Sequence, residues 1–156
     1  MSVVIREAAP EDVDAIVEID RAFSPVFAKV ESYQRLMDAS GTVLLAVCGK
    51  EIAGFAACSR VLDEATLLNL VVVPKARSQG LARNLLDALL DRLVISGVSR
   101  LFLEVRQSNV IAQALYLSAG FQRDGQRAHY YPSHSGGAAE TAILMSRQLE
   151  IQNASA

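Results

Sequence analysis

The sequence predicts an α/β protein with one mixed, seven-stranded β-sheet flanked by about four helices. Residues 66–73 form a near-continuous apolar run, which is typical of a central buried strand. Residues 80–96 repeat apolar side chains at the helical period and stop at Gly97, a common helix terminator. The predicted order is strand, two helices, three strands, helix, strand, helix and two strands. That order favours a mixed sheet whose N-terminal strands are mostly antiparallel neighbours.

Turn and helix-start signals divide the N-terminal half of the chain. A first strand is predicted at 3–6, and Pro10 fits the first turn of a helix that ends near Phe23. Pro25 breaks that helix, and a shorter helix is predicted before Gly41. The Gly49-Lys50 turn then joins two β-rich segments as a hairpin. The predicted elements are strand 3–6, helices 10–23 and 31–38, and strands 42–48 and 51–61.

Proline and glycine residues also mark the element boundaries in the C-terminal half. Pro74 ends the buried strand, and Gly120 ends a short helix that precedes the last two strands. The predicted elements are strand 66–73, helix 80–96, strand 101–105, helix 109–119, and strands 121–131 and 141–149.

Length and composition indicate one domain at 1–149 followed by a tail at 150–156. The net charge of −2 and pI of 5.7 argue against binding of nucleic acid or an anionic membrane through bulk charge. No apolar run reaches the roughly 18 residues that span a bilayer, and the first residues do not resemble a signal peptide. We therefore expect a cytoplasmic protein with no nucleic-acid or membrane partner. Its cysteines, Cys48 and Cys58, are expected to be free thiols, and no metal is expected.

The segment Arg77-Ser78-Gln79-Gly80-Leu81-Ala82, between a buried strand and a helix, has the features of a diphosphate-binding loop. A helix N-terminus offers unpaired backbone N–H groups and the positive end of the helix dipole. Gly80 and Ala82 let the backbone approach a phosphate closely, and Arg77 and Arg83 add positive charge. The loop has neither the Gly-Lys-Ser/Thr ending of a P-loop nor a Gly-x-Gly-x-x-Gly pattern. A glycine at an ordinary strand-to-helix turn remains the structural alternative.

This loop, together with the preceding 69–74 segment Asn-Leu-Val-Val-Val-Pro, resembles the signature of the GNAT acetyltransferase superfamily. The resemblance implies the GNAT acyltransferase fold and acetyl-CoA as cosubstrate. It implies that the fourth strand binds the phosphopantetheine arm and that the loop holds the pyrophosphate. The cofactor-binding residues expected from it are Leu70, Val71, Val72, Arg77, Ser78, Gln79, Gly80, Leu81, Ala82, Arg83 and Asn109.

Several further segments are similar to one branch of the superfamily, the RimI family. They are 61–69 (VLDEATLLN), 103–109 (LEVRQSN), 114–116 (ALY), 120–121 (GF) and 130–132 (YYP). The resemblance implies acetylation of the N-terminal alanine of a small-subunit ribosomal protein, whose N-terminal peptide would be the partner. Tyr130 and Tyr131 would border the peptide channel; a strand-end aromatic pair is the alternative.

The same resemblance assigns Glu104 as general base and Tyr116 as general acid. The chemistry needs these residue types, because the attacking amine must lose a proton and the departing thiolate must gain one. Considered alone, each residue has a structural alternative. Glu104 is then an exposed charge paired with Arg106, and Tyr116 is a half-buried helix residue beside Ala112.

An N-terminal α-amine suits a modest base better than a lysine side chain does. Its pKa is near 7.7–8.0, against about 10.4 for lysine, so deprotonation at neutral pH is easier by roughly 3.4 kcal/mol. The family usually carries a Phe-Pro-Trp-like segment after the first helix. Here residues 23–27 are Phe-Ser-Pro-Val-Phe, and Val73 stands where an aspartate is common. A small-molecule amine, a lysine side chain and a non-catalytic acyl-CoA-binding module therefore remain as alternatives.

Overall fold

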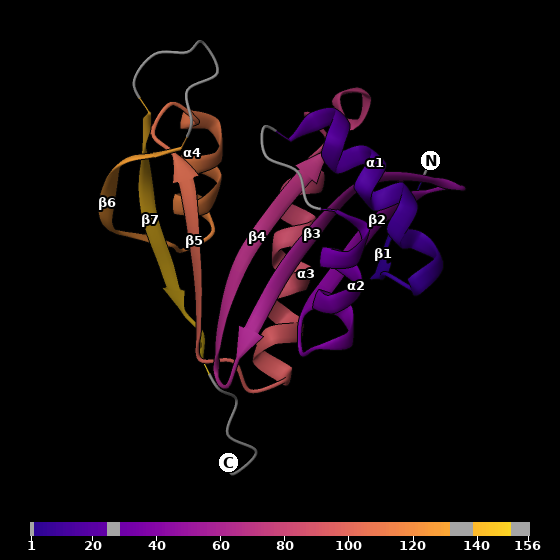
Figure 1. The fold of residues 1–156 in the computed structure, drawn as a ribbon, viewed down its shortest axis with the longest axis horizontal. Coiled ribbons are helices and arrows are strands. Elements are labelled where there is room, and N and C mark those ends of the chain that lie inside the picture. The colour runs from indigo at the N-terminus through magenta and orange to yellow at the C-terminus, as the bar shows by residue number, and fades with distance from the viewer. Residues whose placement is uncertain (1, 25–28, 132–138, 151–156) are drawn as a thin grey trace.

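The computed structural model describes residues 2–24, 29–131 and 139–150, and these residues form one seven-stranded sheet with four α-helices (Figure 1). The sheet and helix count predicted from the sequence is confirmed. The strands are β1 (Val3–Glu7), β2 (Thr42–Cys48), β3 (Glu51–Val61), β4 (Glu64–Val72), β5 (Arg100–Arg106), β6 (Gln122–Tyr131) and β7 (Glu140–Gln148). The helices are α1 (Val13–Phe23), α2 (Val30–Asp38), α3 (Leu81–Ile95) and α4 (Val110–Ser118).

The sheet consists of two antiparallel groups joined by one parallel pair. Its strand order is β1-β2-β3-β4-β5-β7-β6. The first four strands pair antiparallel with their neighbours, as do β5, β7 and β6. Only β4 and β5 pair in parallel among the described strands, and α3 makes the crossover that parallel neighbours require.

Each face of the sheet is covered by helices that present an apolar stripe. On one face α1 and α2 pack Ile16, Val17 and Tyr33 against strand residues such as Phe55. On the other face α3 packs its leucines against β2, β3, β4 and β5, and α4 adds Tyr116. The two faces therefore have separate cores, which we call the α1–α2 side and the α3–α4 side.

Most observed element boundaries differ from the predicted ones by one or two residues. The helix predicted at 10–23 differs by three, because Pro10–Asp12 form a separate 3-10 turn and α1 begins at Val13. Gly80 and Asn109 are N-caps rather than first helical residues, and the side-chain Oδ1 of Asn109 accepts a hydrogen bond from the Ala112 N–H at 3.1 Å. Strand β4 begins at Glu64 rather than 66 because the turn before it occupies only Leu62 and Asp63. The predicted tail continues into residues 151–156, outside the described part of the chain.

Candidate active site

A cleft with a volume of about 850 Å³ opens where β4 and β5 separate. The parallel ladder pairs Glu64–Leu67 with Arg100–Leu103 and ends there. Beyond Leu67 and Leu103 the two strands diverge, which Figure 1 shows as a widening gap between β4 and β5. The cleft is lined by the second halves of both strands, the loop before α3, the first turn of α3, one side of α4 and the end of α1.

A β-bulge at Leu68 determines which way the β4 side chains point. Against β3, the register passes from Cys58↔Leu67 directly to Ala57↔Asn69, so Leu68 is an extra residue. Side chains normally alternate between faces, and one extra residue reverses that alternation. Leu67 and Leu70 consequently both contact the α3–α4 side, whereas Asn69 points to α1.

The α3 N-terminus offers a backbone anion-binding site at one end of the cleft. Gly80 has φ = +78° and Ser78 has φ = +64°, a left-handed conformation that Gly80 adopts at little cost. The first N–H groups of α3 have no intrahelical acceptor, and no side chain caps them within the described residues. Ser78, Gly80, Leu81, Ala82 and Arg83 line the cleft, whereas Gln79 does not.

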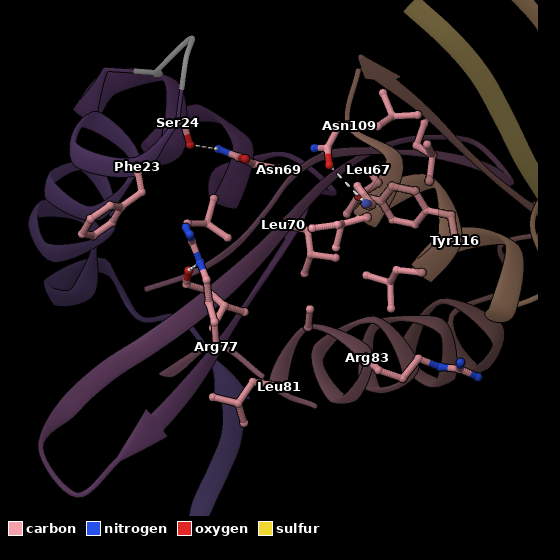
Figure 2. Close-up of a pocket in the computed structure, with 18 of the residues that line it drawn as sticks. Phe23, Ser24, Leu67, Asn69, Leu70, Arg77, Leu81, Arg83, Asn109 and Tyr116 are labelled. Carbon is pink, nitrogen blue, oxygen red and sulfur yellow. Dashed lines mark hydrogen bonds between the residues drawn. The ribbon is translucent and has the colours of Figure 1, made fainter. Parts of the chain in front are cut away.

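Both arginines of this loop are held by hydrogen bonds, a role that the sequence did not reveal. The Arg77 Nε donates to the Val72 carbonyl oxygen at 2.9 Å and braces the loop against the end of β4. The Arg83 Nε donates to Asp87 at 3.0 Å, and its Nη1 donates to Ser118 on α4 at 3.1 Å. Arg83 therefore ties α3 to α4. It is also one of the residues that line the cleft, as labelled in Figure 2.

Glu104 and Tyr116 line the cleft from opposite faces of the sheet. Leu103 and Val105 are buried on the α3–α4 side, so Glu104, which lies between them in β5, projects to the α1–α2 side. The Glu104 side chain is 29% exposed, and its carboxylate lies 3.9 Å from Arg127. Tyr116 projects from α4, is 8% exposed, and packs its ring 5.7 Å from that of Phe121.

The other residues predicted to bind the cofactor also line the cleft. Arg127, which lies beside Glu104, is an addition to the predicted set. Leu70, Val71 and Val72 line the cleft from β4. Asn109 lines it from the start of α4, and its capping bond to Ala112 gives this side chain a structural role as well (Figure 2). On β6, the Arg127 guanidinium stacks 4.7 Å from the ring centre of Tyr130.

A buried polar network lies at the end of α1, and the sequence patterns assign it no role. Asp20 is fully buried and accepts hydrogen bonds from the Tyr33 hydroxyl and the Asn69 amide, each at 2.8 Å. Burial, followed by the charge of Asp20, raises the pKa of the Tyr33 phenol. The signal was present in the sequence, because Asp20 occupies the same helical stripe as Ile16 and Val17.

The described residues also bear on metal binding and on membrane spanning. No group of three or more His, Cys, Asp or Glu side chains is arranged to hold a metal ion in the described part of the chain. No helix there is both long and apolar enough to cross a bilayer. The Tyr131 side chain and the segment 132–138 lie outside what the structure describes.

A family model, named relatives and a solved structure that match this chain are all acetyltransferases. The model of the acetyltransferase (GNAT) family matches residues 13–121. The [ribosomal protein bS18]-alanine N-acetyltransferase of Haemophilus ducreyi is 50% identical over 98 residues, covering 63% of this chain and 67% of that protein. The enzyme of the same name from Escherichia coli is 49% identical over 101 residues, covering 65% and 67%. The crystal structure of the Escherichia coli ribosomal-protein-S18-alanine N-acetyltransferase superposes with a TM-score of 0.89 at 32% identity, covering 99% of both chains.

Proposed function

Because the chain belongs to the acetyltransferase (GNAT) family, we propose that it transfers the acetyl group of acetyl-CoA to the N-terminal alanine of a small-subunit ribosomal protein. The observation that carries this proposal is the 50% identity to a relative named for alanine acetylation of bS18. The reaction would take place in the cytoplasm, where ribosomal proteins are made.

The residues around the α3 N-terminus fit the pyrophosphate of acetyl-CoA. The left-handed Gly80 and the uncapped first turn direct backbone N–H groups at the cleft, and Arg77 and Arg83 supply positive charge beside them. Acetyl-CoA supplies an acetyl group already activated as a thioester. Of the predicted set, Gln79 is the residue with least support, since it does not line the cleft.

The β4 backbone fits the amide-bearing arm of the cofactor. From Asn69 onward β4 is paired with β3 but has left the β5 ladder, so one edge of the strand faces the cleft. Backbone N–H and C=O groups along Leu70, Val71 and Val72 can then bond the arm as a neighbouring strand would. Asn109, at the start of α4, would contact the arm from the other side of the cleft.

We assign Glu104 as the proton acceptor for the attacking amine. It projects to the α1–α2 side, so the amine would approach from that side while acetyl-CoA binds from the α3–α4 side. A carboxylate beside the nucleophile can take its proton directly or through one water. The Arg127 guanidinium lies 3.9 Å from that carboxylate.

We assign Tyr116 as the proton donor to the departing thiolate. Its position on α4 places it on the cofactor side of the cleft, opposite Glu104. The nearly complete burial of its ring against Phe121 restricts its motion, so the hydroxyl is presented in a limited range of positions.

The test is acetyl transfer to a panel of peptides by the purified protein with acetyl-CoA. Peptides beginning with alanine should gain one acetyl group on the α-amine, located by fragmentation mass spectrometry. The same peptides with a blocked N-terminus and a free lysine serve as the control. Acetylation confined to lysine, or turnover restricted to polyamines or aminosugars, would contradict the proposed substrate while leaving the acetyltransferase family intact.

A further inference from the structure

Asp20 is a charged side chain in a fully buried position, and its known partners lead directly to the cleft. Its exposed fraction is 0%, as is that of Ile16 one turn earlier. Burial of a carboxylate is costly unless hydrogen bonds compensate it. Those bonds come from the Tyr33 hydroxyl on α2 and from the side-chain amide of Asn69 on β4. Of these two partners, Asn69 lines the cleft.

The Asn69 amide has one orientation that satisfies its neighbours. Its nitrogen lies 2.8 Å from a carboxylate oxygen of Asp20 and 3.5 Å from the Ser24 hydroxyl, both acceptors (Figure 2 shows the Ser24 contact). The amide group is planar, so its oxygen lies on the other side of Cγ, away from these acceptors.

Asn69 and Glu104 stand on the two strands that border the cleft and project to the same side of the sheet. The bulge at Leu68 turns Asn69 to α1, and strand alternation turns Glu104 to that side as well. They lie just beyond Leu67 and Leu103, the last pair of the parallel ladder. Two acceptors, a carboxylate and an amide oxygen, therefore face the side from which the amine would enter.

We infer that the Asn69 amide oxygen accepts a hydrogen bond from the substrate's primary amine, and that Asp20 is the positioning residue that fixes this orientation. The inference rests on the proposed function. A neutral primary amine has two N–H donors and one lone pair. When Glu104 and Asn69 each hold one N–H, the lone pair is directed between the strands, toward the thioester of bound acetyl-CoA.

An exchange of Asp20 for asparagine would reverse the amide. The Asp20→Asn side chain can keep its carbonyl oxygen on the Tyr33 hydroxyl and turn its NH₂ to Asn69. The Asn69 oxygen would then face the asparagine at position 20, and the NH₂ of Asn69 would face the cleft. In the cleft that donor would meet the N–H donors of the amine. The swapped double variant Asp20→Asn/Asn69→Asp restores both the internal hydrogen bond and an acceptor in the cleft.

The test is a double-mutant cycle on kcat/KM for the amine substrate, with acetyl-CoA affinity measured separately by calorimetry. Asp20→Asn and Asn69→Ala should each lower kcat/KM roughly tenfold, with the acetyl-CoA Kd unchanged. The combined Asp20→Asn/Asn69→Ala variant should be no worse than Asn69→Ala, because Asp20 acts through Asn69. The swapped variant should recover most of the activity. Asp14→Asn, the same change at an exposed position of α1, is the matched control.

Three results would overturn the inference. The first is a double variant in which the two single effects multiply. The second is a rise in the acetyl-CoA Kd that parallels the loss of kcat/KM. The third is an Asp20→Asn activity loss no greater than that of Tyr33→Phe when the two variants lose equal thermal stability. Failure of the proposed function is distinguishable, since the wild type would then acetylate no N-terminal alanine. In that case the same cycle is run on the primary amine that the wild type does acetylate, and the same outcomes decide.

Discussion

Leu67 and Leu103 are the last paired residues of the parallel ladder between β4 and β5, and the cleft begins immediately beyond them. The two leucines belong to the same buried core on the α3–α4 side, which holds the strands together at that point. The bulge at Leu68 follows within one residue on β4. The strands are paired on one side of this point and separated on the other, so the two walls of the cleft come from different strands.

Replacement of Glu104 by glutamine should abolish most turnover. Glutamine keeps the shape of the side chain but cannot accept the amine proton, so kcat should fall by roughly a hundredfold or more. Acetyl-CoA affinity should stay unchanged, because Glu104 lies on the amine side. Steady-state kinetics and calorimetry measure the two quantities. Glu51→Gln, at an exposed surface ion pair with Lys75, is the matched control and should retain full activity.

Replacement of Tyr116 by phenylalanine should slow the reaction without unfolding the protein. The ring contact with Phe121 is kept and only the hydroxyl is lost. If the phenol donates the proton to the departing thiolate, kcat should fall roughly a hundredfold while the acetyl-CoA Kd remains near that of the wild type. Wild-type kcat in this variant would reassign Tyr116 to a purely structural role.

Replacement of Gly80 by alanine should weaken acetyl-CoA binding. A Cβ at φ = +78° costs about 1–2 kcal/mol in this left-handed conformation, so the loop would relax away from the geometry that presents its N–H groups. Gly49→Ala is the matched control, because Gly49 has φ = +63° with open space around it and lies in the β2–β3 turn. Both variants should lose similar stability in urea unfolding, and only Gly80→Ala should raise the acetyl-CoA Kd.

The ion pair between Asp12 and Arg6 should contribute stability that disappears in acid. The hydrogen bond from Arg6, 2.8 Å away, lowers the pKa of the Asp12 carboxyl below its usual value of 3.8. Since the folded-state pKa is the lower one, the contribution is present above the unfolded-state pKa and is lost as pH falls through the folded-state value. Urea unfolding of the wild type and Asp12→Asn should differ at pH 7 and converge toward pH 3. A constant difference across this range would contradict the ionic origin of the contribution.

Replacement of Gly54 by alanine should disturb the floor of the cleft. A Cβ at Gly54, which pairs with Val72 on β4, would lie 2.5 Å from the Val71 carbonyl oxygen. Relief of that contact must move the β4 backbone, so both thermal stability and acetyl-CoA affinity should fall. Gly125→Ala, in a strand position with open space, should change neither.

Most of the fold could be predicted from the sequence because its signals are local. The Gly49-Lys50 turn, the apolar run before Pro74 and the leucine stripe of α3 each depend on neighbouring residues only. The strand-to-helix loop proposed to bind the cofactor was predicted for the same reason, since Gly80 precedes a helix that begins one residue later. The family segments around Glu104 and Tyr116 added residues that no local pattern would have singled out.

What the sequence by itself determined was the order and type of the elements and the loop that suits a diphosphate. The tertiary structure decided the rest. A bulge at Leu68 depends on the register with β3, so whether Asn69 points to α1 or to α3 cannot be deduced from β4 alone. The opposite sides taken by Glu104 and Tyr116, and the contact of Asp20 with Asn69 across 49 residues of chain, arise from the packing of α1 and α4 on the two faces of the sheet. Such relationships join residues far apart in sequence, and only the folded chain specifies them.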